Sequence, residues 1–384
     1  MKADPDAHYV SDEPYDPAAD LKALDRADLD ASTWRLILRR FNRHRLAVVS
    51  GWFLLAIYLA LPFIGFLAPY GATDRDDERI FAAPQAVRLL HEGRFVGPFV
   101  YPRVETFDMG AFRMVSEEDR TRPQPLRFFT TCGAPHRFLG LVETSFRVIC
   151  PPEGGSFNLL GADRLGRDIH SRIMWGAQIS LTVGLIGVAV SFAIGLVLGG
   201  VAGYFGGLTD AAVSRAIEVV RSLPELPIWL ALSAAIPPGW GPVTVFFMIS
   251  IILGVLDWPG LARAVRSKFL ALREEDYVRA AELMGASPKR IIAVHMMPNF
   301  MSHLVASCTL AVPSMILGET ALSFLGLGIR APAVSWGLML NDALDLTAVE
   351  IYPWLLAPLA PVMMVVLAYS FLGDGLRDAL DPYS

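Results

Sequence analysis

The sequence has few of the motifs that carry catalysis or bind metals. It contains three cysteines and no Cys-x-x-Cys pair, so no zinc site is indicated. Its seven histidines include no His-Glu-x-x-His spacing, and we expect no metal site. The Gly-x-x-x-x-Gly-Lys-Ser/Thr phosphate cradle and the Gly-x-Ser-x-Gly nucleophile motif are both missing. We therefore expect a protein that is not an enzyme, holds no cofactor and leaves any ATP binding to another chain.

A strong charge of either sign is also missing. The formal net charge is -5 at pH 7, which does not indicate nucleic-acid binding, because such proteins usually carry a basic face. Acidic residues gather near the N-terminus, where residues 1–30 hold nine of them against three basic residues. This stretch lacks the basic start and apolar core of a signal peptide. We expect residues 1–33 to form a disordered acidic tail in the cytoplasm.

Long apolar runs, in contrast, are abundant. Hydrophobic residues make up 53% of the chain, and the mean hydropathy is +0.43. Because a membrane-spanning helix needs about 20 apolar residues, six runs predict six spans. They are residues 46–68, 179–204, 226–238, 241–258, 300–325 and 353–373. The third run is short and must borrow from residues 216–225.

Arginine and lysine orient these spans. Five arginines lie between residues 35 and 45, and seven basic residues lie between the fourth and fifth runs. Because such residues stay on the cytoplasmic side of a membrane, we expect both termini and the 272–298 loop to be cytoplasmic. Residues 34–68 are then a basic amphipathic segment followed by the first span. Residues 158–384 hold the other five spans.

Residues 69–157 are left outside the membrane as an insertion between helices 1 and 2. The stretches "RFVGPFVYP" and "PHRFLGLVETSFRVI" predict short strands broken by turn residues. Cys132 and Cys150 lie in this insertion. They are a candidate disulfide, because disulfides persist in oxidising, extracytoplasmic compartments. Spacing alone leaves the pairing open.

A polar segment, Asp276 to Phe300, interrupts the apolar runs. Helix formers lead up to Gly285, which suits the left-handed residue that ends a helix. Ser287 then has the chemistry of an N-cap, and Pro288 suits a first helical turn. We expect a helix, a glycine bend and a second helix. This pair is either a docking surface for a partner or an interfacial helix on anionic lipid.

The segment "RAAELMGASPKRIIAVHMMP" resembles the EAA loop of ABC importer permeases. Ala280, Ala281, Gly285 and Pro298 match that pattern, whereas Arg279 stands where the family has glutamate. The resemblance implies a coupling helix that inserts into a groove of an ATPase subunit. The residues implied in docking are Ala280, Ala281, Glu282, Gly285, Ala286, Ser287 and Pro288.

Other stretches resemble the C-type permease subunit of the dipeptide, oligopeptide and nickel importers. "GADRLGRDIHSRIMWGAQISLTVG", "ETALSFLGLGIRAPAVSWG" and "GDGLRDALDP" carry this likeness. The length and place of the insertion resemble Yej-type permeases, which are linked to peptide and microcin uptake. The resemblance implies an all-α membrane protein of six transmembrane helices, with a cytoplasmic coupling helix and a periplasmic insertion.

The implied function is uptake of peptides or peptide-like solutes across a bacterial inner membrane by alternating access. The implied partners are a second homologous permease, two P-loop ATPases that bind ATP and Mg²⁺, a periplasmic substrate-binding protein and membrane lipid. Nickel chelates and opines are alternative substrates within this family. An ATP-independent secondary transporter or channel is the alternative outside it, although the spans lack the buried charges that ion-coupled pathways need.

Two further motifs each allow two interpretations. The motif before the second span either anchors that helix, with an Asp168–Arg172 ion pair, or contacts another protein; its residues are Gly166, Arg167, Asp168, Ser171 and Arg172. Small residues four apart predict close packing within the membrane, or a subunit contact at the translocation path; they are Ser191, Gly195, Gly199 and Gly203.

Two sets of charged residues complete the predictions. We expect Glu319 near the outer interface, either snorkelling or hydrogen-bonded to a partner helix, with substrate contact as the alternative. Glu218, Arg221 and Glu225 can pair along one helix face at the inner interface, with gating as the alternative.

Overall fold

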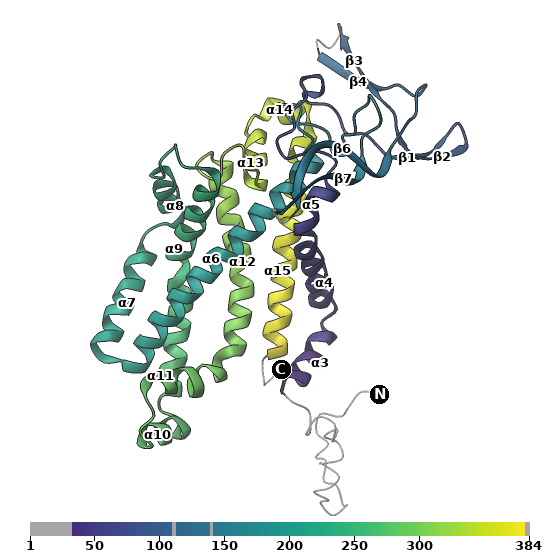
Figure 1. The fold of residues 1–384 in the computed structure, drawn as a ribbon. Helices are drawn as coiled ribbons and strands as arrows, with labels where there is room; N and C mark the ends of the chain where they lie inside the picture. Colours follow the sequence, from purple (N-terminus) through teal and green to yellow (C-terminus); the bar gives the residue numbers. More distant parts are fainter. Residues whose placement is uncertain (1–32, 110–112, 139–140, 381–384) are drawn as a thin grey trace, which may run out of the picture.

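The computed structural model of the chain describes residues 33–109, 113–138 and 141–380. Within these residues, long helices form a bundle that carries a β-rich segment at one end (Figure 1). The predicted acidic tail falls on residues outside the described part, apart from Thr33, the first residue of helix α3 (Thr33–Arg43).

Five helical segments of the described chain are long and apolar enough to cross a membrane. They are Arg45–Leu67, Ile169–Phe205, Pro242–Leu272, His303–Phe324 and Pro353–Leu380. The first comprises α4 (Arg45–Ala60), η1 (Leu61–Phe63) and α5 (Ile64–Leu67). The others are built on α6 (Ile169–Phe205), α9 (Pro242–Leu272), α12 (Met301–Phe324), and η6 (Pro353–Leu356) with α15 (Leu359–Leu380). They coincide with five of the six predicted runs.

The third predicted run does not form one long helix. It is divided between α7 (Gly207–Ser222) and α8 (Glu225–Ala234), with Leu223 extended between them. Pro224 explains the break, because proline donates no backbone N–H and disfavours a helical residue before it. At 10 residues, α8 rises only about 15 Å, half of a bilayer core. In Figure 1, α7 and α8 follow one another beside α9.

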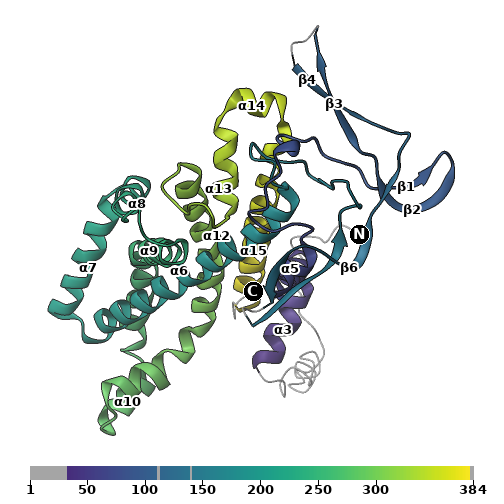
Figure 2. The same cartoon turned by 45° about the horizontal axis from the view of Figure 1, so that its top comes forward.

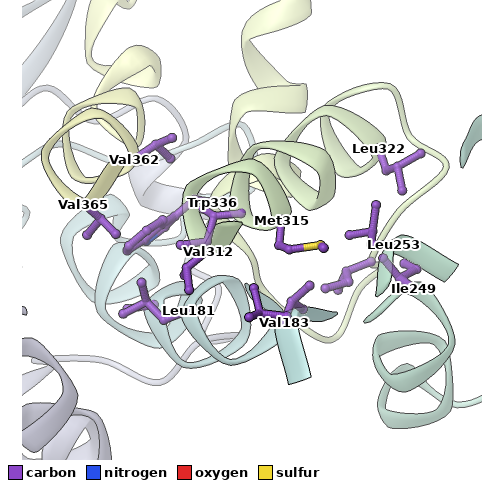
Figure 3. Packing of buried hydrophobic residues seen from close by; sticks show 14 of the residues in the cluster. Leu181, Val183, Ile249, Leu253, Val312, Met315, Leu322, Trp336, Val362 and Val365 are labelled. Carbon is purple, nitrogen blue, oxygen red and sulfur yellow. The ribbon is translucent and has the colours of Figure 1, made fainter. Parts of the chain in front are cut away.

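The core of the bundle forms where α6 lies along α9, with α12 and α15 packed beside them. Leucine, isoleucine, valine and methionine side chains fill this space around one buried tryptophan (Figure 3). The labelled members of the cluster are Leu181, Val183, Ile249, Leu253, Val312, Met315, Leu322, Trp336, Val362 and Val365. Trp336 begins α13 (Trp336–Asn341), and its indole N–H donates to the carbonyl of Ile173 at 2.9 Å.

The insertion is a set of antiparallel strands, so the chain is not wholly helical. The sheets among the described residues are β1 (Arg88–His91), β2 (Arg94–Val100) and β5 (Gln124–Pro125); β3 (Arg103–Asp108) and β4 (Arg113–Glu118); and β6 (Arg127–Phe138) and β7 (Val142–Cys150). The stretches expected to be strands fall on β2 and on the β6–β7 hairpin. In Figures 1 and 2, β3 and β4 project away from the bundle, whereas β6 and β7 lie against the end of α5.

Two features fasten the β6–β7 hairpin. Cys132 and Cys150 form a disulfide, which gives the pairing that the spacing left open. The buried guanidinium of Arg147 donates to the carbonyl of Ala68 at 2.8 Å and to that of Ala134 at 2.9 Å. Arg147 therefore ties the hairpin to the end of the first span.

Tyr70 joins the insertion to α6. Its backbone N–H donates to Ser171 Oγ at 3.1 Å, and its carbonyl accepts from the indole N–H of Trp175 at 3.1 Å. Its hydroxyl accepts from the backbone N–H of Phe157 at 2.9 Å. The first and last parts of the insertion thus meet at one side chain.

The shorter elements lie at the two ends of the bundle. At the end opposite the strands are α10 (Asp276–Leu283), α11 (Pro288–Arg290), η3 (Ile291–Met296) and η4 (Pro298–Phe300). At the β-rich end are η2 (Asp77–Arg79), η5 (Asp342–Leu344) and α14 (Leu346–Ile351). With 37 residues, α6 is about 55 Å long and connects both ends.

Candidate functional sites

The base of α10 is held by apolar packing. Val278 and Ala281 are buried in one cluster with Phe269 of α9 and with Ile291 and Met296 of the following π-helical segment. The first turn of the helix carries Asp276, and an acid there is stabilised by the positive end of the helix. This packing gives α10 a fixed position on the bundle.

The far side of α10 ends in an exposed apolar corner. Leu283 is 90% exposed and Met284 is 82% exposed. Gly285 follows with φ of +81°, a conformation that favours glycine, and no atom lies within 4 Å of where its Cβ would be. The backbone N–H of Gly285 donates to Glu282 O at 2.9 Å, and that of Ala286 donates to Ala281 O at 3.1 Å. The corner is therefore both exposed and shaped by backbone hydrogen bonds.

Polar contacts brace this corner. Tyr204, at the end of α6, donates from its hydroxyl to Glu282 Oε1 at 3.0 Å, and Arg273 donates to the carbonyl of Tyr204 at 3.1 Å. Arg279 pairs with Glu274, and this hydrogen bond lowers the pKa of the Glu274 carboxyl. Arg279, which stands where the family has glutamate, is thus occupied within its own chain.

The structure divides the residues expected to dock. Ala280, Glu282, Ser287 and Pro288 are exposed, and Ala286 is half-buried. Ala281 is buried against its own chain, so it is not open to a partner. Ser287 stands at the N-cap position of α11 but makes no side-chain capping hydrogen bond.

The largest exposed apolar side chains at this corner are those of Leu283 and Met284, which were not among the residues expected to dock. Their signal in the sequence is two large apolar residues directly before the helix-ending glycine of a polar segment.

A buried charge cluster lies at the start of α6. Asp163 accepts from Arg167 Nε at 2.7 Å and from Arg172, and also from the backbone N–H groups of Leu165 and Arg167 at 2.8 and 3.1 Å. Asp342, from the segment after α13, is 3.7 Å from both arginines and 2.9 Å from Arg164. The cluster therefore joins the end of the insertion, α6 and the chain after α12.

The predicted Asp168–Arg172 ion pair is wrong. Asp168 is the N-cap of α6, and its carboxylate accepts from the backbone N–H of Ser171 at 2.7 Å. A side chain in that position turns toward the first helical turn and away from the face that carries Arg172. Burial raises the pKa of Asp168 to about 6, and Arg172 pairs with Asp163 instead.

The rest of the motif is buried as well. Arg167, Asp168, Ser171 and Arg172 are all buried, and a Cβ on Gly166 would lie 1.8 Å from the carbonyl oxygen of Asp76. These side chains are turned into their own protein. The geometry favours the anchoring interpretation of this motif over contact with another protein.

Glu319 lies in a buried polar site on α12, so the expectation that it snorkels is wrong. Its carboxylate accepts from Ser180 Oγ of α6 at 3.2 Å and from Ser323 Oγ at 2.7 Å. The two serines in turn accept from the backbone N–H groups of Trp336 at 3.1 Å and Ile329 at 3.0 Å. Glu319 is hydrogen-bonded to another helix, as one prediction had it, and organises the chain that follows α12.

The small residues on α6 face α9. A Cβ on Gly199 would lie 2.5 Å from Ala262 O, and one on Gly203 would lie 2.8 Å from Arg266 O. Ser191 donates to Asp257 of α9 at 3.2 Å. These small residues therefore allow α6 and α9 to pack closely within one chain.

Two further sites are a charged pair on α7 and an apolar groove. Glu218 pairs with Arg215 at 2.7 Å, so its predicted pairing with Arg221 is wrong.

An apolar groove of about 450 Å³ lies where η1 meets α6 and the start of α9. Gln178, one of the residues that line it, donates to Leu61 O at 3.0 Å. No group of three or more metal-ligating side chains is found among the described residues.

Two family models match this chain. Residues 195–383 match the model described as "Binding-protein-dependent transport system inner membrane component". Residues 32–84 match the model described as "N-terminal TM domain of oligopeptide transport permease C". Most of the insertion lies between the two matched ranges.

Curated relatives and solved structures extend the comparison. The chain is 43% identical over 223 residues to the dipeptide transport system permease protein DppC of Bacillus subtilis, covering 58% of this chain and 68% of that one. It is 37% identical over 223 residues to the oligopeptide transport system permease protein OppC of the same organism, covering 58% and 70%. A structure of the MetNI methionine ABC transporter in inward-facing conformations aligns with a TM-score of 0.42 at 19% identity, covering 56% of this chain and 98% of that one.

Proposed function

We infer the function of this chain from its family, because the chain belongs to the binding-protein-dependent transport system inner membrane components. It is a permease subunit of an ATP-binding-cassette importer and not itself an enzyme. Its cargo is peptides or peptide-like solutes. The relatives named for dipeptide and oligopeptide transport support this cargo.

We propose that the corner formed by Leu283, Met284 and Gly285 docks into an ATPase subunit. The single observation that carries this proposal is the exposure of two large apolar side chains on a helix whose other face is buried. Contiguous exposed apolar side chains are typical of an interaction site. Because α10 packs on α9 and is hydrogen-bonded to α6, a displacement of this corner is transmitted to the membrane spans. Alternating access needs such coupling.

The topology follows from the same proposal. The α10 end of the bundle lies in the cytoplasm with both termini, and the β-rich insertion lies in the periplasm. Together α7 and α8 make the third of six crossings in the inner membrane, because α8 is too short to cross alone. The lysine and arginine distribution supports this orientation.

The assembly would contain a second, homologous permease and two P-loop ATPases that bind ATP and Mg²⁺. A periplasmic binding protein would deliver the peptide. The family model, whose description names binding-protein-dependent transport, supports the last of these partners.

The test is co-purification of the tagged full-length chain, expressed with its companion subunits, in a gentle detergent. We compare Leu283→Asp with Leu346→Asp, since Leu346 is 81% exposed but lies in α14 at the opposite end of the bundle. Leu283→Asp should retain the second permease and lose ATPase by at least about tenfold, the loss of an interface hot spot. Leu346→Asp should keep both.

Two results would overturn the docking proposal. One is normal ATPase recovery with Leu283→Asp. The other is a wild-type chain that purifies alone while cells still accumulate peptide without ATP.

A further inference from the structure

The first span has two unlike faces. Its small residues Ala47 and Gly51 pack on α15, where a Cβ on Gly51 would lie 3.5 Å from Leu372 and one on Gly375 would meet Ala47 Cβ. The opposite side carries large exposed side chains three, four or seven residues apart, which places them on one face. They are Leu46, Val49, Trp52, Leu59 and Phe63. Because helices contact one another in membranes through small residues, the small-residue face is the packed one, and the large-residue stripe is the face that this chain leaves exposed.

The stripe ends at the boundary of the membrane. Phe63 lies 18 residues beyond Arg45 (63 - 45), the first residue of the span. That separation is about 27 Å along a helix, close to the thickness of the hydrocarbon core. Aromatic side chains are enriched at this depth. Whatever touches Phe63 is therefore also near the membrane surface.

The β6–β7 hairpin makes that contact. The ring of Phe138 lies 5.4 Å from that of Phe63 and 5.2 Å from that of Phe66, measured between centroids. Val142 is the direct cross-strand partner of Phe138, and the N–H of Leu141 donates to Phe138 O at 3.0 Å. Leu141 is 85% exposed and Val142 is 58% exposed. The apolar stripe of the span thus continues onto the end of the hairpin.

The same end of the hairpin has a charged side. The next cross-strand pair, Arg137 and Glu143, forms an exposed ion pair at 2.8 Å. Successive side chains along a strand point to opposite faces. The charged pair therefore points away from the side that carries Phe138 and Val142, so the hairpin end is amphipathic.

We propose that the β6–β7 hairpin is a membrane-surface anchor. Phe138 and Val142 enter the acyl and glycerol region of the leaflet beside Phe63, while Arg137 and Glu143 remain in water. The disulfide and Arg147 hold the hairpin in the position that this needs. The insertion is then fixed to the bilayer as well as to the protein, whichever solute the permease carries.

The experiment compares two valines of the insertion. Val142→Cys reports the hairpin, and Val104→Cys, 51% exposed on β3, reports a hairpin that projects away from the bundle. Each is made in the full-length chain with Cys308→Ala, labelled with an environment-sensitive fluorophore and placed in phosphatidylcholine nanodiscs. Quenching is measured with acyl-chain nitroxide lipids and with iodide in solution.

The label at 142 should be quenched by the nitroxide lipids at least about twofold more than the label at 104. Iodide should show the reverse order. Equal quenching at 142 and 104 would overturn the proposal. So would a label at 142 that iodide reaches in the chain alone and that only the second permease shields, because the surface is then a protein interface.

Discussion

Replacing Gly199 with alanine should force α6 and α9 apart. A Cβ at this position would lie 2.5 Å from Ala262 O and 2.9 Å from Ala262 Cα. Ordinary van der Waals contact begins near 3.4 Å, so the two backbones must separate by about 0.9 Å (3.4 - 2.5). The contacts are backbone atoms of a helix, which cannot turn aside as a flexible side chain could.

The expected destabilisation is up to about 2 kcal/mol. Overpacking of this kind costs about 1–3 kcal/mol. Alanine returns up to about 1 kcal/mol through its better helix propensity. The matched control is Gly51→Ala on α4, where the new Cβ would lie 3.5 Å from Leu372 Cδ1, an ordinary contact. That variant should be as stable as the wild type or more so.

The assay is thermal unfolding of both variants in the same detergent, followed by tryptophan fluorescence and by the monomer peak in size-exclusion chromatography. Gly199→Ala should unfold at a lower temperature than the wild type, and Gly51→Ala should not. If Gly199→Ala is as stable as Gly51→Ala, the close approach of α6 and α9 at this level is refuted.

Three further predictions concern the β-rich end. Asp163→Asn removes the carboxylate that pairs with buried Arg172 and should cost about 3–5 kcal/mol, seen as a large fall in unfolding temperature. Because burial raises the pKa of Asp168 from 3.8 to about 6, the folded state holds a proton that the unfolded state releases in this window. Stability should therefore fall as pH rises from about 4 to about 6, and Asp168→Asn should flatten that part of the profile. Cys132→Ser opens a loop with a sequence separation of 18 residues and should cost about 3 kcal/mol, and the buried Cys150 should then react with a thiol reagent only after unfolding.

Length and composition were enough to locate five of the spans, because a charge-free run of about 20 residues has few other stable states. The third run shows where this reasoning stops. Its composition is apolar, but Pro224 interrupts the residues that it must borrow, so α7 packs on α6 and α9 while α8 packs on α9 and α12. Strand positions in the insertion were also indicated, because aromatic and β-branched residues there alternate with turn residues.

The sites were predicted less well than the spans. Spacing suggested that Asp168 pairs with Arg172, but an aspartate at a helix start is better used as a cap, and Asp163 in the same stretch lies nine residues before Arg172, beyond the spacing of one helical turn. The snorkelling of Glu319 was wrong because the side chains that bury it come from distant segments of the chain, Ser180 among them, and spacing does not show such partners. Ala281 was assigned to docking because the motif names it, although only the three-dimensional packing separates its buried face from the exposed face of Leu283.

The hydrogen bond from the N–H of Phe157 to the hydroxyl of Tyr70 affects how the insertion can change during evolution. The two ends of an excursion of nearly ninety residues meet at that bond, and Tyr70 is itself seated on α6. A segment whose ends are adjacent can be lengthened, shortened or exchanged without moving the helices from which it departs. The insertion can therefore change in length or sequence while the arrangement of the transmembrane helices is kept. The two family models match residues on either side of most of the insertion, which agrees with this inference.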